Sequence, residues 1–200
     1  YPYRCLEQTT SRGMGFLFGM GEYPAAGSAD SFPEDLSKEI KKAISRLNTL
    51  QRRDGSFGLW SSTDSSEKWL SVYATDFLMR VSEAGFSVPQ QLTKSALAWL
   101  RSNVRNGRYY DDKKIASVAY SHYVLARANQ GNIGKMRYFF DTHRNDFPSM
   151  IENAFMISAF DAYGDIARSK IAREALMLWT QSAFDSHSPG YDYYSSPLRE

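Results

Sequence analysis

The chain has 200 residues, of which 42% are hydrophobic and 23% are charged. This composition is typical of a folded domain and excludes wholesale disorder. Lys and Arg number 24 and Asp and Glu number 22, which gives a formal net charge of +2. A dedicated nucleic-acid-binding protein normally carries a clear basic excess, so we expect no nucleic-acid partner. No apolar run approaches the length of a membrane span, so we expect no direct membrane contact by this chain.

The N-terminal residues and the cysteine and histidine content also restrict the class of protein. The sequence begins at Tyr1 without an initiator Met, and it shows no signal peptide. We therefore expect a single domain, residues 1–200, that is a fragment of a larger multidomain protein. Cys5 is the only cysteine, and the three histidines have no metal-ligand spacing. This excludes an intrachain disulfide and a multi-cysteine zinc site, and we expect neither a metal nor a cofactor.

Apolar residues recur at helical spacings of three and four along most of the chain. In chain order, this periodicity predicts eight helices, at residues 5–20, 36–50, 69–81, 89–100, 115–126, 133–143, 148–163 and 165–183. Ser31 or Asp35 is the predicted cap of the second helix, and Gly85 is the predicted stop of the third. Runs with the period of two that is typical of strands are scarce. The predicted fold class is therefore all-α.

The predicted helices repeat as pairs. Polar and aromatic turns separate the members of each pair, at residues 53–60, 106–112, 144–148 and 192–197. The repeat of about 40–50 residues is the scale of helix-hairpin repeats. Asp-Gly and Asn-Gly provide the turns, and the aromatic side chains are expected to plug the hairpin ends. Such pairs stack into either an open solenoid or a closed α/α ring.

Cys5 and Gln8 form the constellation with the most specific chemistry. They lie three positions apart near the first predicted helix start, where positions i and i+3 share a face. Attack of the Cys5 sulfur on the Gln8 side-chain carbonyl, with loss of ammonia, would close an internal thioester. A thioester transfers its acyl group to an amine or hydroxyl and releases the thiolate. On spacing alone, a buried helical thiol with a polar neighbour stays an open alternative.

The surrounding residues resemble a known family. Residues 1–11, which read YPYRCLEQTTS, closely resemble the thioester segment of bacterial α2-macroglobulins, relatives of the α2-macroglobulin and complement thioester proteins. Leu6 after the cysteine resembles the bacterial form, because vertebrate members carry Gly there. The turns at 51–60 and 107–112 and the end at 196–200 resemble hairpin ends of the family's thioester domain. The resemblance implies an α/α toroid of helical hairpins, of which this chain would form an incomplete ring.

The resemblance also implies a function. Such proteins are covalent protease-trapping inhibitors rather than enzymes, with a bait region elsewhere in the chain. A protease cuts the bait, the thioester is exposed, and a lysine amine of the protease is captured through the position of Gln8. The implied partners are target proteases and the other domains of the parent chain. The implied location is the periplasm, with the parent anchored to the inner membrane, often as a lipoprotein in bacterial defence.

Several further residues are candidates for the site. Tyr1 and Tyr3 flank the pair, and an aromatic there would shield the thioester from water. Tyr109 and Tyr110 would line the site if they do not simply plug a hairpin end. Some complement relatives use a histidine in a turn before a helix, but the comparable turn at 106–112 has none. We therefore expect direct attack by amines.

His122 lies on the apolar face of its predicted helix. We interpret it as a packed, hydrogen-bonded histidine rather than as a catalyst.

Two alternative functions remain. The pair Asp111-Asp112 resembles the acid motif of terpene and triterpene cyclases, another toroid family, but two lysines follow it. These aspartates are more simply a helix N-terminal cap. The other alternative is a non-covalent α2-macroglobulin-like scaffold in which no thioester forms. The presence of both Cys5 and Gln8 argues against it.

Overall fold

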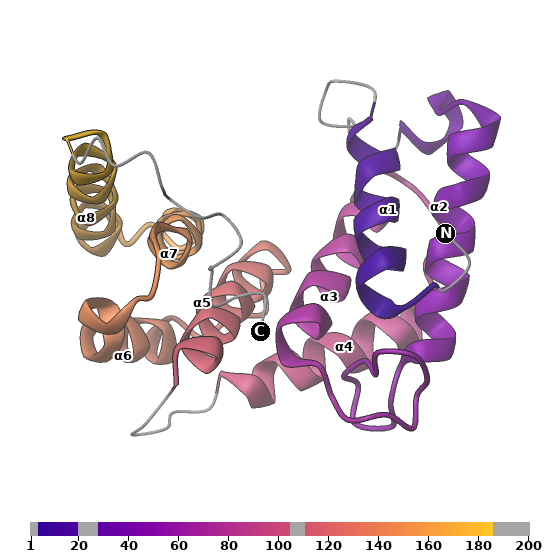
Figure 1. Cartoon of the computed structure of the whole chain (residues 1–200), viewed down its shortest axis with the longest axis horizontal. Helices are drawn as coiled ribbons and strands as arrows, with labels where there is room; N and C mark the ends of the chain where they lie inside the picture. Colours follow the sequence, from indigo (N-terminus) through magenta and orange to yellow (C-terminus); the bar gives the residue numbers. More distant parts are fainter. Residues whose placement is uncertain (1–3, 20–27, 105–110, 186–200) are drawn as a thin grey trace. The chain divides into compact units, whose positions relative to one another are not determined.

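The computed structural model describes residues 4–19, 28–104 and 111–185 (Figure 1). Over these ranges the regular structure is helical and contains no strand, so the predicted all-α class is confirmed. The helices are α1 Leu6–Phe18, α2 Glu34–Leu50, α3 Lys68–Glu83, α4 Gln90–Asn103, α5 Asp112–Arg127, α6 Ile133–His143, α7 Met150–Ala162 and α8 Ile166–Asp185. Short 3-10 helices lie at Ser28–Ser31 and Arg144–Asp146. None of the helices described here is long and apolar enough to cross a membrane.

The chain divides into two compact units, Tyr1–Leu100 and Arg101–Glu200. The prediction of one domain over residues 1–200 and the prediction of an α/α ring both stay predictions. Each of the eight expected helices is present, because hydrophobic periodicity reports directly which helix face is buried. The extra 3-10 helices were not predicted.

In the first unit, α1 packs against α2 and α3 (Figure 1). The apolar faces of these helices meet in one core, whose fully buried members include Leu6, Leu47 and Phe77. Leu6 directly follows Cys5, so the start of α1 is anchored in this core. The position of the cysteine is therefore fixed by apolar packing as well as by hydrogen bonds.

In the second unit, α7 packs against α5 and α8. Aromatic rings fill the space between α6 and α7, with Phe140 in edge-to-face contact with Phe160 at 5.1 Å between ring centroids. Phe147, in the predicted turn at 144–148, stacks on Phe139 at 5.9 Å. An aromatic residue thus closes this hairpin end, as expected.

The predicted caps are right at one helix and wrong at another. Asp111 caps α5, since its Oδ1 accepts the backbone N–H of Lys114 at 2.7 Å. At α2, however, the cap position is Pro33, and no side chain caps the helix. Ser31 lies in the preceding 3-10 helix, and Asp35 is already inside the first turn. Proline ends the preceding segment and presets its own φ, which moves the helix start away from both candidates.

Candidate functional site at the start of the first helix

Cys5 is the N-cap of α1. Its backbone is extended, with φ −67° and ψ 170°, and its Sγ accepts the backbone N–H of Gln8 at 3.4 Å. The Cys5 side chain is buried, whereas Gln8 is exposed. Free N–H groups gather at a helix N-terminus and stabilise negative charge there. The structure therefore brings the two residues of the predicted pair together, with the sulfur covered and the carboxamide side chain accessible.

The backbone just before Cys5 is in an unusual conformation. Arg4 has φ +33°, in the left-handed region that side-chain-bearing residues rarely adopt. Its carbonyl accepts two hydrogen bonds, from Arg46 Nε at 3.1 Å and from Thr9 Oγ1 at 3.3 Å. Tertiary contacts therefore hold the backbone that leads into the helix cap.

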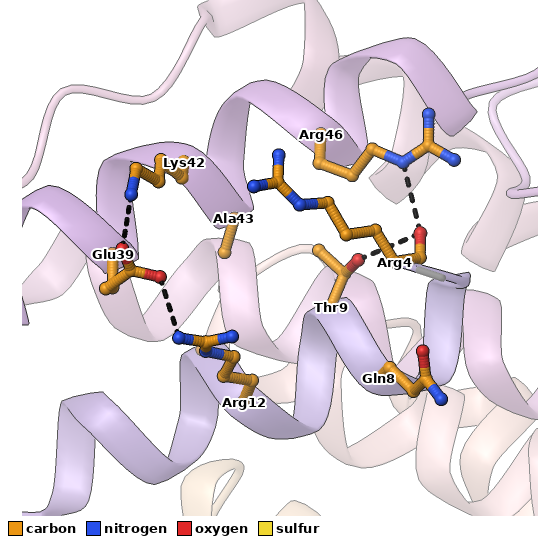
Figure 2. A pocket seen from close by; sticks show the side chains of 9 residues that line it. Arg4, Gln8, Thr9, Arg12, Glu39, Lys42, Ala43 and Arg46 are labelled. Atoms are coloured by element: carbon orange, nitrogen blue, oxygen red, sulfur yellow. Dashed lines mark hydrogen bonds and ion pairs between the residues drawn. The ribbon is translucent and has the colours of Figure 1, made fainter. Parts of the chain in front are cut away.

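Arg46, on α2, is the centre of these contacts. Besides the Arg4 carbonyl, its Nη2 donates to the carbonyl of Trp60 at 2.9 Å and its Nη1 to Thr49 Oγ1 at 3.1 Å. The side chain is half-buried. One guanidinium thus joins α2, the residue before the cysteine, and the segment that follows α2. Figure 2 shows its bond to Arg4 beside the bond from Thr9.

Residues 51–67, which we call the support loop, lie beneath the start of α1. The carbonyl of Leu59 accepts the backbone N–H of Leu6 at 2.8 Å. Phe57 is fully buried and plugs the hairpin end as expected, but Trp60 is 49% exposed, so the same expectation is wrong for it. The Trp60 backbone carbonyl accepts the hydrogen bond from Arg46.

Asp64 fixes the shape of the support loop. Its carboxylate accepts the backbone N–H groups of Trp60 at 2.6 Å and of Ser61 at 2.9 Å. The bond from Trp60, followed by those from Ser61, holds the pKa of the Asp64 carboxyl below its usual range. The loop therefore presents its carbonyls to α1 and α2 in a defined arrangement.

A pocket of about 370 Å³ opens beside Gln8 (Figure 2). It is lined by Arg4, Gln8, Thr9, Arg12, Gly13, Glu39, Lys42, Ala43 and Arg46. Glu39 pairs with Arg12 at 3.1 Å and also with Lys42. The hydrogen bond from Lys42 holds the pKa of the Glu39 carboxyl below its usual range. Four cationic side chains face one carboxylate, so the surroundings of Gln8 are electropositive.

The other predicted site residues do not join this group. Tyr1, Tyr3, Tyr109 and Tyr110 lie outside the described residues. Within the described ranges, no cluster of His, Cys, Asp and Glu side chains is suited to hold a metal ion.

His122 is a packed core residue in the second unit, as expected. It is 2% exposed, and its ring centroid lies 5.3 Å from that of Phe139. Burial, with a smaller effect of Lys135, lowers its pKa to about 3, so the imidazole is neutral. Its Nε2 finds no hydrogen-bond partner among the described residues.

Sequence reasoning missed Arg46, Thr9 and the Leu59 carbonyl. Arg46 lies 42 positions from Arg4, and its partners are backbone carbonyls. A weak signal is its position between Ile44 and Leu47, beside the apolar stripe of α2.

Comparison with known proteins identifies the family. Residues 2–128 match the family described as the A-macroglobulin TED domain. Alpha-2-macroglobulin of Escherichia coli K12 is 33% identical over 98% of this chain, and the match spans 12% of that protein.

Solved structures agree with this match. Native E. coli alpha-2-macroglobulin, from domain MG7 to the C-terminus, has a TM-score of 0.75 at 30% identity, covering 89% of this chain and 29% of that one. The trypsin-activated E. coli protein has a TM-score of 0.74 at 29% identity, and the match covers 89% of this chain and 13% of that one. Salmonella alpha-2-macroglobulin reacted with methylamine has a TM-score of 0.74 at 30% identity, and the match covers 90% of this chain and 12% of that one. The family match covers more than half of the chain and the E. coli relative nearly all of it, and the chain therefore belongs to the A-macroglobulin TED (thioester) domain family.

Proposed function

We propose that this chain is the thioester-domain part of a covalent protease trap, in which Cys5 and Gln8 form an internal thioester. One observation carries the proposal: the Cys5 sulfur caps the helix on which Gln8 lies and contacts the Gln8 backbone at 3.4 Å. Two relatives support it, one solved after activation by trypsin and one after reaction with methylamine. Because the chain spans only 12% of its E. coli relative, the trapping activity belongs to a larger polypeptide.

Thioester closure requires the sulfur and the side-chain carbonyl of Gln8 to meet. The Cys5 sulfur attacks the Gln8 Cδ, the bond from Cδ to Nε2 breaks, and the thiol proton leaves with the nitrogen as ammonia. The atoms balance without a cofactor. Burial of Cys5 keeps water from one side of the bond, which limits the competing hydrolysis.

In the transfer step, the Cys5 sulfur is the leaving group rather than the nucleophile. A lysine amine attacks the Gln8 carbonyl, the bond from carbon to sulfur breaks, and the product is an amide between Gln8 and the target lysine. The amine proton goes to the Cys5 thiolate. The N–H of Gln8 at the helix start stabilises negative charge on the departing sulfur. The reaction consumes the thioester, so the protein acts once per molecule and is not an enzyme.

The electropositive pocket affects the approach of the attacking amine, not the closure of the thioester. Arg4, Arg12, Lys42 and Arg46 surround Gln8 with cationic groups, and only Glu39 opposes them. A protonated lysine is repelled from this region, whereas a neutral amine is not.

The proposed partners are target proteases, through Gln8, and the other domains of the parent chain. The periplasmic location and the inner-membrane anchor of the parent are part of the same proposal and rest on the family resemblance.

A thiol titration tests the proposal. Cys5 is the only cysteine, so methylamine should release one thiol per chain from a thioester, and none should react beforehand. The Gln8→Glu variant has no side-chain amide to expel as ammonia and therefore cannot acylate the Cys5 sulfur in this way, so it should show one reactive thiol from the start. Gln181→Glu makes the same change at an exposed position on α8 and should behave like the wild type. A wild-type chain whose thiol reacts without methylamine, alone and in its parent polypeptide, would contradict the proposal.

A further inference from the structure

We propose that Arg46 is the positioning residue of the thioester, because its guanidinium fixes the backbone that places Cys5 over Gln8. This inference rests on the proposed function. Arg46 acts through the carbonyl of Arg4 rather than directly on Cys5 or Gln8. It is therefore distinct from the reacting pair.

The three bonds of Arg46 use the shape of the guanidinium. Nε, Nη1 and Nη2 each donate to a different group: the Arg4 carbonyl, the Thr49 hydroxyl and the Trp60 carbonyl. The bond to Thr49 stays within α2 and orients the side chain. The other two join the residue before Cys5 to the support loop. Lysine carries one ammonium on a flexible stem and cannot reproduce this fixed fork.

The backbone strain at Arg4 explains why such a clamp is needed. At φ +33°, Arg4 is in a conformation that an ordinary residue leaves unless surrounding contacts hold it. Among the described residues, only Arg46 and Thr9 donate hydrogen bonds to its carbonyl. Loss of the stronger, charged donor lets Arg4 relax, which turns the neighbouring Cys5 away from its cap geometry.

Misplacement of Cys5 has a direct chemical consequence. Ring closure depends on the alignment of the sulfur with the Gln8 carbonyl, and small displacements strongly reduce intramolecular reactivity. A hydrogen bond from a charged donor corresponds to about tenfold in an equilibrium. We therefore expect about tenfold less thioester when Arg46 is replaced.

Arg12 provides a matched control. It lines the same pocket and is also a cation, but it forms its ion pair with the Glu39 side chain rather than a bond to the backbone before Cys5. Arg12→Gln and Arg46→Gln each remove one positive charge from the pocket. A purely electrostatic role would make the two variants equal, whereas the positioning role affects only Arg46.

The test measures the fraction of folded chains in which methylamine releases the Cys5 thiol. Arg46→Gln should lower this fraction about tenfold, Arg46→Lys should restore little of it, and Arg12→Gln should remain within about twofold of the wild type. Hydrogen exchange of the Leu6 amide, which donates to Leu59, should accelerate in the Arg46 variants alone. A general loss of stability would accelerate exchange of the core amides as well, whereas the positioning role predicts faster exchange at the start of α1 and unchanged exchange in the core.

The outcomes separate the two proposals. A reactive wild type with equal fractions in Arg46→Gln and Arg12→Gln would overturn the positioning role alone. A wild type without a thioester would overturn the proposed function and this inference together. If Arg46→Gln fails to fold, the Arg46→Lys variant provides the test. A methylamine-released thiol fraction equal to that of the wild type, at an unchanged melting temperature, would overturn the inference.

Discussion

Gly55, in the support loop, is a position where one methyl group should be costly. Its φ is +92°, a conformation that strains any residue with a Cβ. A Cβ placed there would lie 2.2 Å from the Ser95 carbonyl oxygen and 3.3 Å from the Trp99 Cβ. The first contact is with the backbone of α4, which cannot rotate away as a flexible side chain would. Gly55→Ala must therefore displace either the loop or the helix.

The expected cost has two parts. The left-handed backbone costs about 1–2 kcal/mol for a residue other than glycine. Overpacking against fixed neighbours adds about 1–3 kcal/mol. Gly55→Ala should therefore lower the free energy of unfolding by about 2–5 kcal/mol. Because the same loop presents the Leu59 and Trp60 carbonyls, the thioester fraction should fall as well.

Gly15→Ala is the matched control. Gly15 is exposed within α1, and a Cβ there would meet nothing within 4 Å. The same substitution should raise stability by about 0.5–1 kcal/mol, because alanine favours the helix. Urea denaturation of both variants measures the difference. Equal stabilities, or a Gly55→Ala loss below about 1 kcal/mol, would refute the clash derived from the structure.

Two further predictions concern the cores of the two units. Gly13→Ala places a Cβ 2.6 Å from the Phe77 ring and should cost about 1–3 kcal/mol. Adding Phe77→Leu to Gly13→Ala should recover part of that loss, because the smaller side chain relieves the contact. Additive effects of the two substitutions in a double-mutant cycle would contradict this prediction. For His122, the folded pKa of about 3 lies below the ordinary histidine pKa of 6.5, so the unfolded chain binds more protons between these values. The wild type should lose about 2 kcal/mol more than His122→Leu between pH 7 and pH 5, measured by urea denaturation, and parallel pH profiles would contradict this.

The helices were predictable because their signal is local. Periodicity gave 133–143, and the structure has α6 at Ile133–His143. The cap of α5 was also local, since Asp111 bonds three residues ahead. The cap of α2 was not predictable in this way, because Ser31 and Asp35 match cap preferences equally well and Pro33 determines where the helix starts.

The candidate site was predictable only as a pair. The spacing of Cys5 and Gln8 and the similarity of residues 1–11 to a family indicated where the chemistry lies. Nothing in the sequence marks the strained backbone of Arg4, where glycine would be the usual residue. Nor does it mark Arg46, because hydrogen bonds to backbone carbonyls across 42 positions leave no pattern in residue types.

The mass of the native chain tests the central claim most directly. Thioester closure expels ammonia, so the chain should be about 17 Da lighter than its sequence requires. After methylamine treatment, peptide mapping should find Gln8 as the methylamide and Cys5 as a free thiol. An unmodified Gln8 and a free Cys5 thiol, with the full sequence mass before and after methylamine, would contradict the thioester.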